Sequence, residues 1–453
     1  MMTLREAALL AEARLIGDGD ALVRRVVTDS RAVEAGDLFV ALKGERFDAH
    51  DFVPDVLARG AAVLVSRECG VGNQLLADDT RLALGRLAAG WAARQNAVRI
   101  GITGSNGKTT VKEMVSAILR AHAGDDAVHA TAGNFNNDIG LPLTLLGLRA
   151  EHRYAVIEMG MNHHGELSYL TALARPQVAL VNNAMRAHLG HFADTTDVAR
   201  AKAEIFSGLL ADGVAILNQD DANLAVFEAA AAGHRQLRFG LAASANVRAD
   251  AVELLPLESR FTLRAPAGDT AVVLSAPGEH NVRNALAAAS VALALNLPLA
   301  DIAAGLAAFG GAKGRLQKKA LPQGGTLIDD TYNANPDSMK AGLDVLARLP
   351  APRVFVMGDI GELGEGAAAM HAEVGEHARA LGIEGLLTLG EMSRHAAAAF
   401  GNGAESFDSC EALLGWLDGR LPSGASVLIK GSRFMRMERV VEHLMATDKK
   451  EKV

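Results

Sequence analysis

Residue types that could bind a phosphate occur at positions 100–110, which read Ile-Gly-Ile-Thr-Gly-Ser-Asn-Gly-Lys-Thr-Thr. A glycine loop that leads into a helix presents converging backbone N–H groups, and the helix dipole adds partial positive charge. In such a loop we expect Lys108 to reach a terminal phosphate and the Thr109 hydroxyl to bind Mg²⁺. The strict pattern requires glycine where this chain has Ile102. The match is therefore to a shorter core, and the alternative is a glycine-rich helix start without a ligand.

Acidic, histidine and lysine side chains elsewhere could complete a metal-dependent site. Glu158 ends a predicted strand, and Mg²⁺ usually takes one or two carboxylates besides phosphate oxygens; the alternative is a solvated strand end. His188 and His191 are close in sequence, but no cysteine or clear third ligand supports zinc. Lys202 lies in a helix predicted over residues 197–210, where lysine is usually a solvated charge. A desolvated lysine beside a metal cluster could instead lose its proton and react with CO₂ to give an anionic carbamate.

The hydrophobic pattern predicts the elements that position these residues. Apolar residues alternate at 98–102 as in a strand, and those at 111–119 follow one helix face. Further strand runs separated by helical segments follow at 154–158, 178–182 and 214–218. This alternation predicts a parallel sheet covered on both faces, and ligands bind beyond the carboxyl ends of such strands. The phosphate loop, Glu158, Asn182, Asn183 and Asn218 are all expected at that edge.

Two further regions flank this sheet. Residues 1–84 combine short apolar runs with helical stretches and predict a small α/β domain, whose polar loops at 29–31 and 42–50 either bind a ligand or reflect turn chemistry alone. Residues 312–453 predict a second, Rossmann-like α/β sheet. Its strand runs lie at 326–329, 353–357, 385–389 and 426–430. We therefore expect an α/β protein of three domains, with a central P-loop ATPase-type parallel sheet over residues 85–311 and a cleft between domains.

Composition argues against several classes of protein. The chain has 45 basic and 53 acidic residues and a formal net charge of −8, which argues against a general nucleic-acid-binding protein. Cys69 and Cys410 lie far apart in sequence and suggest neither a disulfide framework nor a C-x-x-C metal site. No apolar run of about 18 residues or more occurs, and the charged N-terminus has no signal-peptide core. We expect a cytoplasmic monomer without membrane insertion.

The chain resembles the ATP-dependent Mur ligases of peptidoglycan synthesis in motifs that span nearly its whole length. The matching segments lie at 103–110, 133–142, 158–160, 187–190, 201–206, 278–285, 314–315 and 329–336. The order and coverage of these segments carry the resemblance. The shortened phosphate loop is also a feature of this family.

Within the family, segments 330–336, 358–364 and 430–433 resemble the branch that adds D-alanyl-D-alanine to UDP-N-acetylmuramoyl-tripeptide. The tripeptide-forming branch has an Asp-Asn-Pro-Arg signature that this sequence lacks. Folylpolyglutamate synthases share the phosphate loop but have a shorter N-terminal region. The resemblance implies an ATP-dependent ligase that works through an acyl phosphate, with these small molecules as its substrates. Residues 1–84 would then bind the UDP substrate, residues 85–311 ATP, and residues 312–453 the dipeptide.

The resemblance also implies roles for individual residues. The catalytic set would be Lys108, Glu158, His188 and Lys202. The ATP contacts would be Gly104, Ser105, Asn106, Gly107, Lys108, Thr109 and Thr110 at the phosphates, Asn281 at the adenine, and Arg315 and Asp330 from the third domain. The metal ligands would be Thr109 and Glu158 for one Mg²⁺, with His188 and carbamylated Lys202 for a second. The substrate contacts would be Ser30, Arg31, Lys43 and Asp48 for the uridine nucleotide, Asn134 and Asn137 in the central cleft, and Tyr332, Asn333 and Asn335 near the dipeptide.

Two other functions stay open. One is a related amide ligase of the Mur or polyglutamate type with another donor. The other is a nucleotide-binding scaffold without catalysis, which would not need the whole charge cluster of Lys108, Glu158, His188 and Lys202. A simple phosphotransferase would not need the two extra domains.

Overall fold

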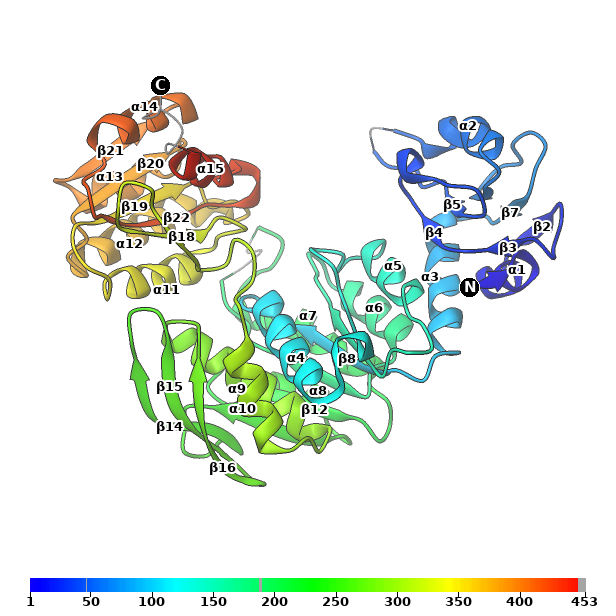
Figure 1. The fold of residues 1–453 in the computed structure, drawn as a ribbon, viewed down its shortest axis with the longest axis horizontal. Helices are drawn as coiled ribbons and strands as arrows, with labels where there is room; N and C mark the ends of the chain where they lie inside the picture. Colours follow the sequence, from blue (N-terminus) through cyan, green and yellow to red (C-terminus); the bar gives the residue numbers. More distant parts are fainter. Residues whose placement is uncertain (46, 187–189, 447–453) are drawn as a thin grey trace.

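Three α/β bodies follow one another along the part of the chain that the structure describes, residues 1–45, 47–186 and 190–446 of a computed structural model (Figure 1). The N-terminal and C-terminal bodies lie at opposite ends of the molecule, and the central body lies between them. The predicted α/β class with three domains is thereby confirmed. The domain limits at residues 84 and 311 stay predictions, and helix α3 (Thr80–Ala92) crosses the first of them.

The N-terminal body is built on a sheet of strand order β2-β7-β6-β5-β4, in which β2 runs antiparallel to its neighbour. Helix α3 begins where the Asp79 carboxylate accepts hydrogen bonds from two backbone N–H groups, at 2.7 and 3.0 Å. The helix packs on α1 and on α5 and α6 of the central body, so one core runs through both. The elements are β1 (Met2–Thr3), α1 (Leu4–Ala11), β2 (Arg14–Ile16), β3 (Leu22–Val23), β4 (Val26–Val27), η1 (Ser30–Ala32), β5 (Leu38–Val40), η2 (Ala49–Phe52), α2 (Val53–Ala58), β6 (Ala62–Val65) and β7 (Gln74–Leu76).

The central body has a sheet of order β16-β15-β14-β13-β12-β11-β8-β10-β9. The strands from β9 to β14 are parallel, as predicted from the strand runs of the sequence. Strands β15 and β16, where no strand was predicted, add an antiparallel edge to the sheet. A two-residue turn at 266–267, followed by Gly268 (φ +120°) at the start of β16, joins β15 to β16 directly, so no crossover helix is needed. The elements are β8 (Val98–Thr103), α4 (Lys108–Ala123), η3 (Asp125–Ala127), β9 (Val128–Ala130), α5 (Gly140–Leu146), β10 (Tyr154–Glu158), α6 (Glu166–Ala174), β11 (Val178–Val181), α7 (Thr195–Ala203), η4 (Glu204–Gly208), β12 (Val214–Asn218), α8 (Leu224–Ala230), β13 (Arg235–Gly240), β14 (Val247–Leu254), β15 (Ser259–Ala265), β16 (Gly268–Leu274), α9 (Glu279–Ala294) and α10 (Leu299–Ala308).

The C-terminal body has a sheet of order β17-β18-β22-β19-β20-β21, parallel except for β17. Apolar clusters cover both faces, as expected for a parallel sheet between helices. The elements are β17 (Gln317–Ala320), β18 (Thr326–Asp330), α11 (Pro336–Leu346), β19 (Arg353–Gly358), η5 (Gly364–Gly366), α12 (Ala367–Ala380), β20 (Gly385–Leu389), α13 (Arg394–Phe400), β21 (Ala404–Phe407), α14 (Cys410–Arg420), β22 (Ser426–Lys430), η6 (Arg433–Met435) and α15 (Glu438–Ala446).

The predicted strands of the central and C-terminal bodies are present within one residue of their expected ends. The helix expected at 197–210 is shorter, because α7 ends at Ala203 and the chain continues as the 3-10 turn η4. Among the described residues, no helix has the length and apolar character needed to cross a bilayer.

Candidate functional site

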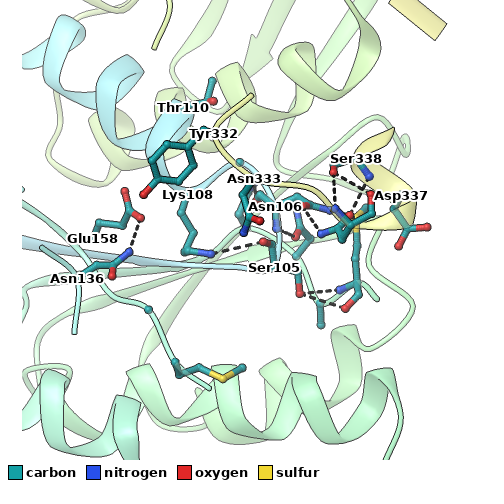
Figure 2. Close-up of a pocket in the computed structure, with 18 of the residues that line it drawn as sticks. Ser105, Asn106, Lys108, Thr110, Asn136, Glu158, Tyr332, Asn333, Asp337 and Ser338 are labelled. Atoms are coloured by element: carbon teal, nitrogen blue, oxygen red, sulfur yellow. Dashed lines mark hydrogen bonds between the residues drawn. The ribbon is translucent and has the colours of Figure 1, made fainter. Parts of the chain in front are cut away.

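A cavity of about 1530 Å³ lies between the carboxyl edge of the central sheet and the C-terminal body. The phosphate loop, Glu158 and the ends of β11 and β12 line it from the central body, and residues around Tyr332 and Asn335 line it from the C-terminal body. Figure 2 shows Lys108 and Glu158 together with Tyr332 and Asn333. The predicted convergence of polar strand ends is therefore confirmed. The cavity draws on segments that are far apart in sequence, as an interdomain active site does.

The phosphate loop is short because β8 runs through Thr103. Ile102 is a fully buried residue inside this strand, which explains why the glycine of the longer motif is missing. Gly107 has φ +79°, and a Cβ there would lie 2.4 Å from Asn284 Oδ1. Only glycine fits this position, and helix α4 begins at the next residue, Lys108. The loop thus has the strand–loop–helix form of an anion site.

Asparagine side chains hold the phosphate loop against the neighbouring strands. Asn106 N–H donates to Asn183 Oδ1 at 2.8 Å, and Asn182 Nδ2 donates to Asn106 O at 2.9 Å. Asn182 Nδ2 also lies 2.9 Å from Asn284 Oδ1, and Asn284 Nδ2 donates to Asn281 Oδ1 at 3.2 Å. The predicted adenine contact is therefore linked to the phosphate loop through a continuous hydrogen-bond network.

The Lys108 ammonium is folded back onto its own loop. Its Nζ donates to Gly104 O at 2.7 Å and to Ser105 O at 3.4 Å. Burial lowers the pKa of Lys108, the negative charge of Glu158 raises it, and the positive charge of Arg315 lowers it further. A phosphate in the loop would supply the anionic partner that this desolvated cation lacks.

Glu158 is 2 % exposed and has a carboxylate with two different surroundings. Asn136 Nδ2 donates to Oε1 at 2.8 Å, and the backbone N–H of Glu158 donates to Thr131 Oγ1 at 3.0 Å. Oε2 is buried and has no hydrogen-bond partner among the described residues. Such an unsatisfied buried oxygen is costly unless a ligand completes it, and a hard cation such as Mg²⁺ fits this oxygen.

Arg315 reaches across from the C-terminal body to the phosphate loop. Its Nη2 donates to Thr109 Oγ1 at 3.0 Å, and its guanidinium carbon lies 4.3 Å from the centre of the Tyr332 ring. Its Nε is buried without a hydrogen-bond partner in the described part of the chain. An orphan donor beside the loop fits the predicted contact to a phosphate oxygen.

The segment after β18 is held by a buried ion pair. Lys430 Nζ lies 2.6 Å from Asp330 Oδ2 and donates to Asn333 O at 2.9 Å. Asn335 Nδ2 then donates to Asn106 Oδ1 at 2.6 Å, which joins the C-terminal body to the phosphate loop. These contacts place the predicted dipeptide-side residues opposite Lys108.

Most of the residues predicted for the nucleotide and the cleft lie at this cavity. Of the predicted site residues, those that line it are Ser105, Asn106, Gly107, Lys108, Thr110, Asn134, Asn137, Glu158, Asn281, Arg315, Asp330, Tyr332, Asn333 and Asn335. Gly104 lies in the same loop and Thr109 in the first turn of α4, and neither is among the described residues that line the cavity. Their assignment to ATP, metal or substrate stays a prediction.

The predicted second metal set is only partly described. Lys202, on α7, is 1 % exposed and is not a lining residue of the cavity. Burial, with a smaller contribution from the charge of Lys108, holds the pKa of Lys202 well below its usual value. His188 lies outside the described residues, and no cluster of three His, Cys, Asp or Glu side chains that could hold a metal occurs among the described ones.

The predicted uridine-binding residues lie in the N-terminal body, and none of Ser30, Arg31, Lys43 and Asp48 is among the described residues that line the cavity. Arg31 pairs with Asp29 at 2.8 Å. Asp48 accepts from the backbone N–H of His50 at 3.0 Å and from its ring at 2.6 Å, and these bonds lower the pKa of Asp48 to about 2. Turn chemistry accounts for these contacts, and the role in substrate binding stays a prediction.

Asn136, Arg186 and Lys430 were not predicted as site residues. Arg186, in the loop after β11, pairs with Asp337 at 2.6 Å and with Glu373 at 2.7 Å in the C-terminal body. Lys430 and Asn136 both lie in motifs that carry the family resemblance, which was the available signal. For Arg186 the surrounding sequence offered none.

Three protein-family models match the chain. "Mur ligase family, catalytic domain" matches residues 22–90, "Mur ligase middle domain" matches residues 102–292, and "Mur ligase, glutamate ligase domain" matches residues 314–433. Together they follow the succession of the N-terminal, central and C-terminal bodies.

Individual relatives match over nearly the full length. The UDP-N-acetylmuramoyl-tripeptide--D-alanyl-D-alanine ligase of Escherichia coli (strain K12) is 44% identical over 449 residues, which cover 98% of each chain. A crystal structure of MurF from Acinetobacter baumannii is 41% identical, covers 98% of each chain and superposes with a TM-score of 0.91. The structure of MurF ligase from Thermotoga maritima in complex with ADP is 28% identical, covers 95% of this chain and 98% of that one, and has a TM-score of 0.83.

Proposed function

The chain belongs to the Mur ligase family, and we propose that it joins D-alanyl-D-alanine to UDP-N-acetylmuramoyl-tripeptide with ATP. It is an ATP-dependent ligase that forms C–N bonds. The relatives that match nearly its whole length at 40–44% identity are named for this reaction. The product would be the UDP-linked pentapeptide precursor of peptidoglycan.

The observation that carries the proposal is the composition of the cavity. The phosphate loop with Lys108 and the buried, unpartnered Oε2 of Glu158 lie on one side, and the 331–336 segment of the C-terminal body lies on the other. One side suits a nucleoside triphosphate and a cation, and the other suits an incoming amine. A ligase needs both in one enclosed space.

In the proposed reaction, the tripeptide carboxylate attacks the γ-phosphorus of ATP, and ADP leaves. The amine of the dipeptide then attacks the acyl phosphate, loses a proton and expels inorganic phosphate. Lys108 would leave its bonds to Gly104 O and Ser105 O and neutralise charge that develops on the transferred phosphoryl group. The Arg315 guanidinium, with its orphan Nε, would do so from the C-terminal side.

Mg²⁺ would be held by Glu158 and Thr109, and when bound it would offset the repulsion between the phosphates and the attacking carboxylate. Thr109 Oγ1, which accepts from Arg315 in this arrangement, would exchange that donor for the cation. Lys202 would carry a carbamate and, with His188, hold a second ion. The lowered pKa of Lys202 supports this assignment, because only a neutral amine reacts with CO₂.

The proposal is tested with the purified protein, ATP, Mg²⁺, UDP-N-acetylmuramoyl-tripeptide and D-Ala-D-Ala, by measuring ADP release and the pentapeptide product. We expect ADP release to require both substrates. D-Ala, D-Glu and L-glutamate are tested as alternative donor amines. Faster turnover with one of them would favour a related amide ligase, and nucleotide binding without any turnover would favour a scaffold.

We further infer that the protein acts in the cytoplasm as a monomer. The nucleotide-linked tripeptide and ATP are both polar and charged. The described contacts assemble the cavity from one copy of the chain.

A further inference from the structure

The loops that follow β19 and β22 form a single wall of the cavity. Ser432 N–H donates to Asp359 O at 3.0 Å, and Ser432 Oγ accepts from Gly361 N–H at 2.8 Å. A Cβ on Gly431 would lie 3.1 Å from Gly358 Cα, so the two loops approach as closely as glycine allows. These loops contain the segments 358–364 and 430–433, to which the proposed chemistry so far gives no contact with a ligand.

This wall presents an aromatic ring to the cavity. Phe434 is 64% exposed and lines the cavity with Gly361 and Arg433. A Cβ on Gly361 would lie 2.8 Å from Phe434 Cε1, so the ring rests directly on the glycine backbone. An exposed ring in a cavity suits a small apolar group of a ligand.

The cationic side chains of the C-terminal body that line the cavity differ in how far they are buried and hydrogen-bonded within the protein. Lys430 is buried against Asp330 and Asn333, and Arg315 is bound to Thr109 and stacked on Tyr332. Arg433 is 63% exposed, and its Nη1 donates to Glu438 Oε1 at 2.9 Å. A guanidinium has five N–H donors in a planar fork, so one carboxylate contact leaves others to face a ligand.

Arg433 also faces the same space as Tyr332. Burial raises the pKa of Tyr332, and the charge of Arg433 opposes that rise, as does that of Arg315. Arg433 therefore lies within electrostatic range of the segment predicted to lie near the dipeptide. The wall thus combines a cation and an apolar ring beside this segment.

We propose that Arg433 binds the C-terminal carboxylate of the incoming dipeptide and that Phe434 packs against its terminal methyl group. The inference rests on the proposed function and identifies the group that recognises the far end of the second substrate. A carboxylate matches the guanidinium fork in a bidentate geometry. Glu438, at the start of α15, accepts a hydrogen bond from Nη1 of Arg433, which lines the cavity.

The test compares D-Ala-D-Ala with D-alanyl-D-alaninamide, in which a neutral carboxamide replaces the carboxylate. With the unaltered enzyme we expect kcat/KM to be roughly 10- to 100-fold lower for the amide, as for loss of a charged hydrogen bond. In Arg433→Met, kcat/KM for D-Ala-D-Ala should fall to the level of the amide, and that for the amide should stay unchanged. The KM values for ATP and the UDP-tripeptide should not move.

Two control variants separate binding from structure. Arg348→Met removes an exposed arginine of the same body away from the cavity and should keep the full discrimination. Glu438→Gln weakens the ion pair but keeps the guanidinium, so it should also discriminate. If Glu438→Gln lost the preference for D-Ala-D-Ala over its amide as completely as Arg433→Met, Arg433 would have a structural role and the inference would fail. If Arg433→Met kept the full preference, the inference would also be overturned. An unaltered enzyme without dipeptide-dependent ADP release would overturn the proposed function itself.

Discussion

Single side chains at the cavity hold charge in surroundings that favour a ligand. Within the described part of the chain, Glu158 Oε2 is buried without a partner, and the hydrogen-bond partners of the Lys108 ammonium are backbone carbonyls of its own loop. Each group is poorly satisfied, because desolvation is not fully offset by hydrogen bonds. A bound nucleotide and cation would satisfy both groups at once.

Lys202 allows a direct test at the residue scale. Burial lowers its pKa, so at neutral pH the amine is more often unprotonated than an ordinary lysine and can react with CO₂. We expect Lys202→Ala to reduce kcat by roughly 10²-fold or more, the size of losing one electrostatic stabiliser. Short carboxylic acids should restore part of the rate.

A spectroscopic measurement distinguishes the carbamate from a merely structural lysine. With ¹³C-bicarbonate, NMR should detect a carbamate carbon in the unaltered protein, and this signal should be absent from Lys202→Arg. Below the lowered pKa of Lys202 the amine is protonated, so the signal should decline as the pH falls. Unchanged activity in Lys202→Ala would remove this residue from the site.

At the element scale, helix α4 holds the phosphate loop in place through close packing against α10. A Cβ on Gly305 of α10 would lie 2.3 Å from Ile118 Cα of α4, which is a backbone atom and cannot rotate away. The two helices therefore touch at their backbones. This contact fixes the position of α4, the helix that begins at Lys108.

Gly305→Ala should destabilise the protein by about 1–3 kcal/mol, because the added methyl group overpacks the contact between the helices. The matched control is Gly415→Ala on α14, where a Cβ would meet nothing within 4 Å. There alanine should raise the free energy of unfolding by up to about 1 kcal/mol through helix propensity. Urea unfolding of both variants measures the difference, and equal effects would contradict it.

At the scale of the whole molecule, ion pairs hold the C-terminal body on the central body. Arg186 donates to both Asp337 and Glu373, and Lys340 contacts Glu373 as well. Hydrogen bonding from Arg186 is the largest cause that lowers the pKa of Glu373 to about 2. By contrast, α3 joins the N-terminal body to the central one through a shared apolar core. The two junctions should therefore respond differently to salt and pH.

Arg186→Met should loosen the C-terminal body, and small-angle X-ray scattering should then give a larger radius of gyration. High salt should have the same effect on the unaltered protein, because half-exposed ion pairs are screened. The stabilisation that the Glu373–Arg186 ion pair gives to the junction is fully present above the ordinary pKa of a glutamate. It is lost as the pH falls toward about 2, the lowered pKa of Glu373, because protonation removes the charge. Arg394→Met, at an exposed pair within the C-terminal body, should leave the radius unchanged.

The sequence by itself determined the features that depend on neighbours along the chain. The phosphate loop, the strands and helices around it, and the polar residues at the strand ends follow from local periodicity and from the rule that parallel strands share one carboxyl edge. Their meeting at one cavity could be predicted for that reason. No strand was predicted at β15 and β16, and local periodicity would not have given their antiparallel direction.

Only the tertiary structure decided which groups meet across the domains. Asn106 and Asn335 are hydrogen-bonded although they are 229 residues apart, and Arg186 meets Glu373 across 187 residues. Such contacts depend on how folded bodies dock, which no local pattern encodes. The unpartnered oxygen of Glu158 likewise arises from burial by several segments together. The phosphate-binding loop and the polar strand ends beside it could therefore be predicted from the sequence, whereas the contacts by which the C-terminal body encloses the site could not.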